Sequence, residues 1–456
     1  MSDLYFREQE LKRLDDFAGS KKKKALAIYG RRRTGKTELV LHFMKKRKQA
    51  DVLYFQCTGY DYNKNLGDFR AVLKTHLPDD TILDSLQTFK DCISYFAKSS
   101  GGGEVIVIDE FPFLCKKNED VAVEFQWIID HGLFGLKIIL LGSNLSFMKK
   151  QMNDTEAPLY GRFDEMIEVV PFTFPEVNHL FPVFEDAVNV YAQTGGVAQY
   201  VMMYKDYRKV RTATAHLFFQ KSGRLLQEAE NILMQELRDT TTYVSVLRVL
   251  SGGDKDSGQI AARSGIDPRS VFSYLNKLID LGIVDVVPNL LTSKKNEKRY
   301  RIRDALFRFN YFFIEPHISM ITAMGENSMK VILDDRYTQY LGYVYEDIIR
   351  ENIYAYAMNK RIPFVPTTVG KWWGNIMHEG VWGESEVDLV AYDDHNVVIG
   401  ECKYRNKKVG RKELETLREK ASFIPAKGRK YYYLLASKAG FTDDVKREDA
   451  ILIEGA

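Results

Sequence analysis

The hydrophobic positions of the first third of the chain fall into short continuous runs, with helical patterns between them. The runs lie at 25–29, 52–56, 105–109 and 137–142. In segments such as 37–48 and 121–131, apolar residues recur with the period of a helix instead. Continuous apolar runs are typical of strands buried on both faces, and their alternation with helices indicates a parallel sheet. The fold class predicted here is therefore α/β.

The pattern changes three more times along the chain. Residues 172–238 are helical and rich in aromatics, and residues 239–305 show helices followed by two short strands. Residues 306–456 return to mixed α/β, with strand-like runs at 386–391, 397–403 and 430–436. We therefore predict four domains, at 1–171, 172–238, 239–305 and 306–456.

Composition indicates the class of protein and its cellular compartment, but it does not indicate a function. The chain has 456 residues, 45% hydrophobic and 28% charged, which suits several globular domains, and its net charge of +3 is too small to indicate a polyanionic partner by itself. Four cysteines without a CxxC pair argue against a disulfide framework or zinc knuckle and suit a reducing cytosol. No apolar stretch reaches the roughly 18 residues of a membrane span, so we expect a cytoplasmic location and no membrane partner.

A phosphate-binding motif follows the first predicted strand. Residues 30–37 fit GxxxxGK[ST] between a strand and a helix, the context that makes this motif credible. Backbone N–H groups of such a loop converge on phosphates, while Lys36 would bind the β- and γ-phosphates of ATP and Thr37 would ligate Mg²⁺. The predicted nucleotide-binding residues are Gly30, Arg31, Arg32, Arg33, Thr34, Gly35, Lys36 and Thr37.

Two carboxylates end the run at 105–109. Asp109 and Glu110 follow buried aliphatic residues, at the carboxyl edge where open α/β sheets bind ligands. Asp109 would hold Mg²⁺ through water, and Glu110 would polarise the attacking water. The alternative is a core strand with a solvated acidic end; the P-loop upstream favours the catalytic interpretation.

Two further polar residues are candidates for the same chemistry. Asn144 follows the run at 137–142 and would contact the γ-phosphate or orient water, although asparagine also caps helices. Arg162 follows Gly161 in a predicted loop. It would act as an arginine finger in trans, sense nucleotide in cis, or simply form a surface salt bridge.

These motifs together resemble the archaeal-type ATPases of the AAA+ class. The resemblance covers about residues 1–235 and rests on FREQEL, GRRRTGKTEL, VIVIDEF, LLGSN, LYGRF and TGGVAQYV. It implies that Phe6–Leu11 lies near the adenine and that the helical segment 172–238 forms a lid. Ala198 stands where the common form of the lid motif has proline.

Residues 244–302 read as three helices and two strands. Asp267 is predicted to cap the third helix, with Pro268 as its first residue. The unit resembles a winged helix-turn-helix, in which the third helix would enter the DNA major groove and the strand tip would bind phosphates. The residues implied are Arg269, Ser270 and Ser273 on the helix, with Lys294, Lys295 and Lys298 on the wing. Docking to protein, within or between chains, is the alternative.

The last domain carries acidic residues in a strand–turn–strand pattern. Asp388 lies before a turn, and Glu401 and Lys403 lie after it, two residues apart and therefore on one strand face. Two carboxylates on a metal beside a lysine suit phosphodiester hydrolysis, with Mg²⁺ or Mn²⁺ as the metal. Glu346, on an upstream helix, is a supporting ligand.

This pattern resembles the PD-(D/E)xK nuclease fold over about residues 335–440, with Val387 in place of the proline. A hairpin salt bridge, or a degenerate nuclease fold that only binds, stays open. Residues 401–430 hold 11 Lys and Arg against 4 Glu, which suits nucleic acid but equally a solvated helix face. Trp372 and Trp373 would stack on bases or, more commonly for such a pair, pack in the core.

The sequence therefore predicts an ATP-hydrolysing AAA+ ATPase coupled to DNA binding and metal-dependent DNA cleavage, in DNA processing or defence. ATP, Mg²⁺ and DNA are the expected cofactors and partners, and a homo-oligomer would let Arg162 act in trans. The alternative is a nucleotide-switched regulator that binds DNA or protein through an inactive nuclease-like domain.

Overall fold

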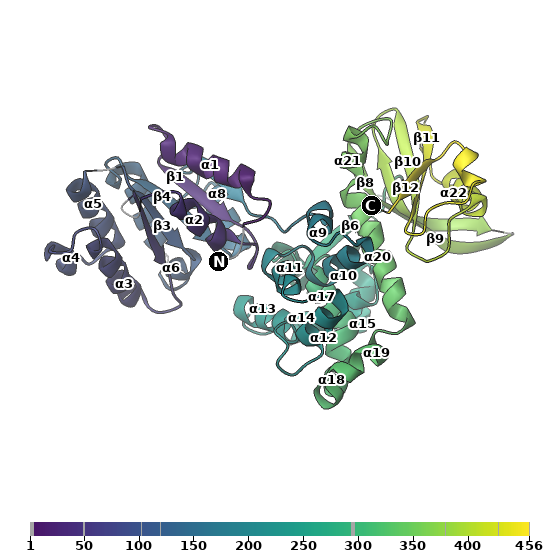
Figure 1. The fold of residues 1–456 in the computed structure, drawn as a ribbon, viewed down its shortest axis with the longest axis horizontal. Coiled ribbons are helices and arrows are strands. Elements are labelled where there is room, and N and C mark those ends of the chain that lie inside the picture. The colour runs from purple at the N-terminus through teal and green to yellow at the C-terminus, as the bar shows by residue number, and fades with distance from the viewer. Residues whose placement is uncertain are drawn as a thin grey trace. The chain divides into compact units, whose positions relative to one another are not determined.

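The computed structural model describes residues 4–48, 51–101, 103–118, 120–292, 297–378, 380–426 and 428–455. The chain separates into two compact units (Figure 1). The first unit is Met1–Phe172 with Val197–Tyr200, and the second is Thr173–Gly196 with Val201–Ala456.

A parallel sheet forms the centre of the first unit, as predicted. Within the described residues it has the strand order β2-β3-β4-β1-β5, and all neighbours are parallel. The four apolar runs of the sequence are the first four strands, with the predicted bounds. The short edge strand β5 was missed, since only one of its side chains is buried. The strands are β1 Ala25–Tyr29, β2 Val52–Gln56, β3 Val105–Asp109, β4 Lys137–Gly142 and β5 Glu165–Glu168.

The strand order explains how distant motifs meet. Strand β4 pairs with β1 on one side, where Tyr29 faces Gly142, and with β3 on the other. Because parallel strands end at the same edge, the segments that follow these three strands lie next to one another. Residues 30–37, 109–110 and 143–144 therefore share one edge of the sheet.

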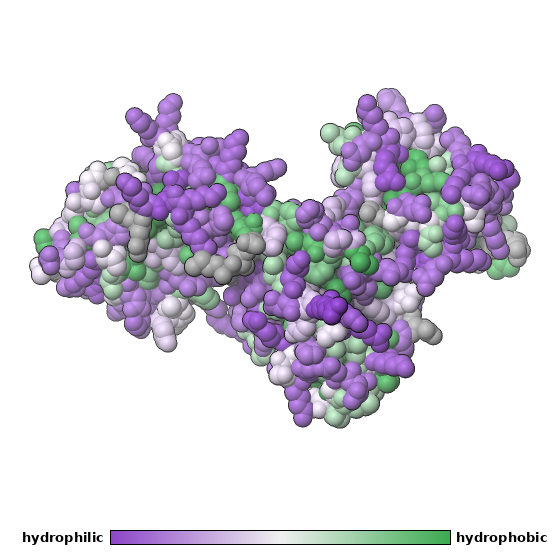
Figure 2. All heavy atoms as spheres, in the orientation of Figure 1, coloured by the Kyte–Doolittle hydropathy of each residue, from purple (hydrophilic) through white to green (hydrophobic). Residues whose placement is uncertain are grey.

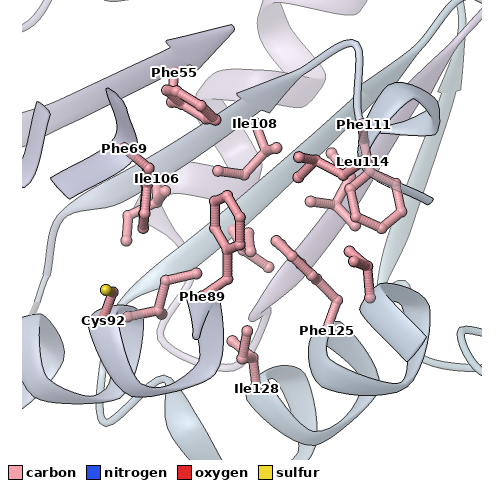
Figure 3. Packing of buried hydrophobic residues seen from close by; sticks show 14 of the residues in the cluster. Phe55, Phe69, Phe89, Cys92, Ile106, Ile108, Phe111, Leu114, Phe125 and Ile128 are labelled. Carbon is pink, nitrogen blue, oxygen red and sulfur yellow. The ribbon is translucent and has the colours of Figure 1, made fainter. Parts of the chain in front are cut away.

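Helices cover both faces of this sheet (Figure 1). On one face, α1 and α2 bury Leu14, Phe17 and Phe43 against the strands. On the other face, phenylalanines of α3, α5 and α7 form an aromatic core, in which Phe89 contacts Phe69 and Phe125 (Figure 3). The helices of this unit are α1 Glu8–Gly19, α2 Lys36–Lys45, α3 Tyr62–Lys74, α4 Ile82–Ser85, α5 Phe89–Ser100, α6 Pro112–Lys117, α7 Asp120–Trp127 and α8 Leu145–Asn153, with a π-helical turn at Ile128–Gly132.

The second unit begins with helices, as the sequence predicts for the segment after residue 171. They are α9 Phe174–Leu180, α10 Phe184–Thr194, α11 Ala198–Lys205, α12 Val210–Phe218 and α13 Glu228–Glu236. The first residues of α11, up to Tyr200, belong to the first unit instead.

Three helices and an antiparallel strand pair follow. They are α14 Thr241–Ser251, α15 Ser257–Ser264, α16 Val271–Asp280, β6 Val284–Pro288 and β7 Lys298–Ile302. The predicted start of the third helix was wrong by three residues. The Asp267 carboxylate accepts from the backbone N–H of Arg269 at 2.7 Å and its carbonyl accepts from Ser270, which closes a turn before Val271. Lys294 and Lys295 lie outside the described residues.

A second sheet organises the C-terminal part, with strand order β12-β11-β10-β9-β8 among the residues that the structure describes. Strands β8, β9 and β10 are antiparallel, whereas β10, β11 and β12 are parallel, with α22 between β10 and β11. The sequence missed β8 and β12. The strands and α22 are β8 Thr368–His378, β9 Val381–Tyr392, β10 Asn396–Lys403, α22 Arg411–Ser422, β11 Lys430–Ser437 and β12 Ile451–Glu454.

Helices connect the strand pair to this sheet. They are α17 Ala305–Phe309, a π-helical turn at Asn310–Ile314, α18 Ile318–Met324, α19 Met329–Ile332, α20 Asp335–Glu351 and α21 Ile353–Met358, with short 3₁₀ turns at Glu315–His317 and Gly325–Ser328. A further 3₁₀ turn, Val445–Arg447, lies between β11 and β12. Trp372 and Trp373 are 4% and 5% exposed, so they pack in the interior and the stacking interpretation is wrong. Throughout the described ranges, no helix is both long and apolar enough to cross a bilayer.

Candidate functional site

The P-loop closes tightly because two of its positions accept only glycine. Gly30 has φ 153°, and a Cβ there would lie 2.3 Å from the carbonyl oxygen of Val169. Gly35 has φ 95° and is the N-cap of α2. A side chain at either position would be strained, and at Gly30 it would also push the loop off the end of β5.

Lys36 lies inside this loop. Its ammonium donates to the carbonyl oxygens of Gly30 and Arg31 at 2.9 and 2.8 Å, and the residue is 6% exposed. Burial lowers the pKa of Lys36 to about 8, while the charges of Glu110 and Asp109 oppose that change. The ammonium therefore lacks solvent and is close to two carboxylates, and a phosphate at the loop would restore its charged form.

Thr37 and Asp109 meet where α2 begins. The Thr37 hydroxyl donates to Oδ2 of Asp109 at 2.7 Å. A hydroxyl and a carboxylate are oxygen ligands of the kind Mg²⁺ takes, so the two residues fit the ion that the motif implies. Tyr54, on the neighbouring strand β2, donates to the same Oδ2 atom at 2.7 Å. Tyr54 was not predicted from the sequence; its hydroxyl among the apolar residues of β2, next to the acidic strand, was the available signal.

Glu110 is held in a turned backbone. Its φ is 53°, and its N–H donates to Oδ1 of Asp109 at 2.7 Å. Ser143 donates its hydroxyl to the Glu110 carboxylate, with oxygen distances of 3.0 and 2.8 Å. Asn144 accepts from the N–H of Phe147 at 2.9 Å and so caps α8, the alternative role considered for it. The structure thus brings Asp109, Glu110 and Ser143 into one hydrogen-bonded group.

Arg162 lies at the end of the sheet where the strands begin, opposite to the end that carries the P-loop. It precedes β5, whose first residue Glu165 is level with Leu26 near the start of β1. Its guanidinium binds Asp130 at 3.1 Å, just before β4, and the carbonyl of Tyr160 at 3.0 Å. This position is incompatible with nucleotide sensing in cis, because the P-loop follows the opposite end of β1. The role in trans stays a prediction.

The N-terminal segment touches the P-loop through an arginine that sequence reasoning missed. Arg7 is 4% exposed and donates to the carbonyls of Val170 at 2.6 Å and Thr34 at 3.3 Å. Its guanidinium lies over the ring of Phe172, which Phe6 contacts edge-on. The segment therefore joins the P-loop to the chain after β5. The start of α11 also reaches the loop, since the N–H of Gln199 donates to the carbonyl of Arg33 at 3.1 Å.

The C-terminal acidic residues share one face of the second sheet. The β9–β10 pairing ends at Leu389 opposite Gly400, and one further step sets Asp388 opposite Glu401. The Asp388 carboxylate accepts from the N–H of Cys402 at 2.8 Å. Burial, followed by the charges of Glu346 and Glu401, raises the pKa of Asp388 well above its ordinary value. The three carboxylates are therefore close enough to repel one another.

Lysines surround this acidic cluster. Glu401 accepts from Lys403 at 2.6 Å and from Lys420 at 3.0 Å, and Glu346 accepts from Lys371 at 2.8 Å. Lys371 and Lys420 were missed, because β8 was not predicted and helical lysines carry no specific signal. In the described part of the chain, no three His, Cys, Asp or Glu side chains are grouped so as to hold a metal ion. The metal role of these carboxylates stays a prediction.

One more charged cluster joins the strand pair to the C-terminal part. Asp347 on α20 accepts from Arg301 of β7 at 2.5 Å, from Arg308 at 2.7 Å, and from Arg350. Burial alone would raise its pKa, but the three guanidiniums hold the pKa of Asp347 well below its usual range. Removing this carboxylate would leave three buried cations with one partner fewer.

Comparison with known protein families gives a match that spans the first unit. Residues 4–204 match the family described as an ATPase domain predominantly from Archaea, and residues 310–416 match a family of archaeal and bacterial proteins of unknown function. The Walker-type ATPase PABY2304 of Pyrococcus abyssi has a similar fold, with a TM-score of 0.51 and 17% identity over 68% of this chain and 96% of that one. The N-terminal part of the chain is therefore similar to archaeal ATPase domains in sequence and to a Walker-type ATPase in fold.

Two other proteins are similar over most of their length. An uncharacterized protein of Methanocaldococcus jannaschii is 28% identical over 445 residues, which is 95% of both chains. The ORC2 protein of Aeropyrum pernix, solved with ADPNP and ADP, gives a TM-score of 0.45 with 14% identity, over 70% of this chain and 95% of that one.

Proposed function

We propose that the chain hydrolyses Mg·ATP and couples that cycle to DNA bound by residues 239–305. The observation that carries the ATPase part is the 2.7 Å hydrogen bond between Thr37 and Asp109 beside the buried ammonium of Lys36. The DNA part is supported by the three-helix and strand-pair arrangement, with Arg269, Ser270 and Ser273 exposed around the start of α16.

Each residue of the nucleotide site has a chemical task in this proposal. Lys36 and the loop N–H groups bind the phosphates, and Thr37 and Asp109 would hold Mg²⁺, which neutralises phosphate charge when bound. Glu110 accepts the proton of the attacking water. Ser143 holds the Glu110 carboxylate in place until that water arrives. Asn144, whose side-chain oxygen caps α8, would in addition contact the γ-phosphate.

Arg162 completes the site of a second copy in this proposal, which makes the active form a homo-oligomer. The test mixes two inactive chains, Lys36→Ala and Arg162→Ala. A mixed interface contains one site with an intact P-loop and an intact Arg162, so the mixture should recover ATP hydrolysis that neither chain shows alone. A mixture as inactive as its components would contradict the trans assignment.

The DNA assignment is tested by the exposed residues of α16 and its preceding turn. Arg269→Ala should weaken DNA binding and reduce stimulation of ATP hydrolysis by DNA, while the basal rate is kept. Arg263, exposed on the preceding helix, gives a matched control as Arg263→Ala. If both variants and the parent chain have the same DNA affinity, the DNA assignment is wrong and the alternative of protein docking holds for this unit.

We further propose metal-dependent DNA cleavage at Asp388, Glu401 and Lys403. The support is the shared sheet face of the two carboxylates and the lysine paired with one of them. The carboxylates would hold Mg²⁺ or Mn²⁺, whose chemistry is to activate water, and Lys403 would stabilise phosphate charge. A different observation favours DNA binding without cleavage. Glu401 is already paired with Lys403 and Lys420, so its carboxylate is engaged by cations other than a metal ion.

Cleavage of plasmid DNA with Mg²⁺ or Mn²⁺ decides between the two roles. Asp388→Ala and Lys403→Ala should abolish cutting, whereas Asp394→Ala, in the exposed turn between the same strands, should not. Cutting by all three variants would point to a contaminant. If the parent chain binds DNA and never cuts it, the alternative of a nucleotide-switched regulator holds.

A further inference from the structure

The first unit contains a cavity at the edge of its sheet opposite to the P-loop. It has a volume of about 530 Å³ and is lined where the chain enters β1, β3 and β4, by residues 18–21, 23–24, 103, 129–131 and 133–137. This size falls within the range of ligand sites in proteins. No residue of the nucleotide site described above lines the cavity, so it is a separate feature of the ATPase domain.

The lining of this cavity is basic. Lys21, Lys23, Lys24 and Lys137 line it, against a single acidic residue, Asp130. Asp130 is already paired with an arginine at 3.1 Å, and Lys23 with a glutamate at 2.7 Å. The side chains of Lys21 and Lys24 have no ion pair within the described ranges, although the Asp164 carboxylate accepts from the backbone N–H of Lys24 at 2.6 Å. Figure 2 shows that hydrophilic residues also dominate the visible surface over α1, which ends at this cavity.

Lys137 adds a buried charge to the wall. It is 8% exposed, and its ammonium donates to the carbonyls of Phe17 at 3.1 Å, Lys23 at 3.0 Å and Ser20. Burial lowers the pKa of Lys137. Its hydrogen-bond partners are carbonyl dipoles, and the charge of Asp164 opposes the change in its pKa. The ammonium adds positive charge to the wall, which favours an anion in the cavity.

An exposed aromatic ring completes the lining. Phe134 is 52% exposed and has φ 43°, a left-handed backbone that is strained for a residue with a side chain. The ammonium of Lys98 lies 4.7 Å from its ring centre. A phenylalanine presented in this way among lysines is the combination that binds single-stranded nucleic acid, because bases stack on the ring while cations bind phosphates.

We propose that this cavity binds single-stranded nucleic acid, with phosphates at Lys21 and Lys24 and a base against Phe134. A duplex keeps its bases stacked inside and offers no free base face to the ring, which favours a single strand. The site is separate from the DNA contact proposed for α16, so either assignment can fail without the other. A free nucleotide shares the same chemistry, and the experiment separates the two.

The experiment uses the full chain with its P-loop saturated by Mg²⁺ and a non-hydrolysable ATP analogue. The probe is a fluorescent thymidine oligonucleotide of about 12 nucleotides, a length within the usual site sizes. It is used in two forms: unmodified for binding, and with 5-iodouracil for photocrosslinking. Crosslinked peptides should contain Phe134. Crosslinks that map only to other segments would overturn the proposal.

Substitutions give the second readout. In the double variant Lys21→Gln, Lys24→Gln, two phosphate contacts are lost. The slope of log affinity against log salt concentration should therefore be smaller in magnitude by about 1.4 than for the parent chain. Phe134→Ala should weaken binding by about fivefold or more. Lys149→Gln, Lys150→Gln, two exposed lysines of α8 away from the cavity, is the charge-matched control and should bind normally.

ATP hydrolysis without nucleic acid should be unchanged in the cavity variants, which shows that the domain is folded. Three results would overturn the proposal: equal oligonucleotide affinity in the cavity and control variants, equal crosslinking in both, or displacement of the oligonucleotide by thymidine monophosphate at equal phosphate concentration. The last result would assign the cavity to free nucleotides. The Arg269→Ala variant should keep the Phe134 crosslink, because it changes only the α16 contact.

Discussion

The hydroxyl of Thr37 and the carboxylate of Asp109 are joined by a 2.7 Å hydrogen bond across 72 positions of the sequence. The bond exists because the strands before them are both neighbours of β4 and end at one sheet edge. It places the two oxygens that would hold Mg²⁺ together before any nucleotide is present. Preorganisation of this kind lowers the free energy needed to assemble the site.

Tyr54 is expected to position Asp109. In Tyr54→Phe the carboxylate loses one of its two donors at Oδ2. A hydrogen bond to a charged group is worth about 1.5–3 kcal/mol, so the Mg²⁺ concentration for half-maximal ATP hydrolysis should rise by about 10-fold or more. A Mg²⁺ titration at fixed ATP measures this. Tyr62→Phe is the matched control, since that hydroxyl binds Glu124 outside the site. Coinciding titrations for both variants and the parent chain would show that Tyr54 has no such role.

Nucleotide affinity should depend on pH through Lys36. Its pKa is lowered to about 8, so in the free protein the ammonium is charged below that pH and loses its proton above it. Phosphate binding needs the charged form, and affinity for an ATP analogue should therefore fall by about tenfold per pH unit above 8, with uptake of a proton on binding. Calorimetry in two buffers of different ionisation enthalpy measures that uptake. Affinity that stays level between pH 8 and 10 would be inconsistent with this assignment.

The second unit should depend on Asp347. Asp347→Asn leaves the guanidiniums of Arg301, Arg308 and Arg350 without their shared carboxylate, and should lower the free energy of unfolding by about 3–5 kcal/mol. Denaturation by urea, followed by tryptophan fluorescence, reports mainly this unit, because Trp372, Trp373 and Trp382 belong to it.

The control for that measurement is Glu384→Gln. Glu384 is 66% exposed and pairs with Arg299, so its loss should cost about 0–1 kcal/mol. Equal effects of the two substitutions would mean that the buried cluster does not stabilise the unit.

The sequence predicted what depends on local pattern. Strands β1 to β4 are continuous apolar runs, and Lys36 and Asp109 stand at positions that the motifs define. Strand β8 was missed because Gly370, Lys371 and Gly374 interrupt its apolar residues, although pairing with β9 still builds the strand.

Residues whose roles come from distant partners were also missed. Arg7 is one arginine at the start of a helix, and only the folded chain brings it to the carbonyls of Thr34 and Val170. Asp267 was predicted to begin a helix, yet its carboxylate and carbonyl close a turn first. No periodicity in the sequence carries either fact.

The central claim is that Mg·ATP is hydrolysed at this site with Glu110 as the base. The most direct test measures ATP-analogue binding and steady-state phosphate release for the parent chain and Glu110→Gln. The account predicts that the variant binds nucleotide as tightly as the parent chain and releases phosphate at least about 100-fold more slowly, as loss of a general base does. Phosphate release at the parental rate by Glu110→Gln would contradict it.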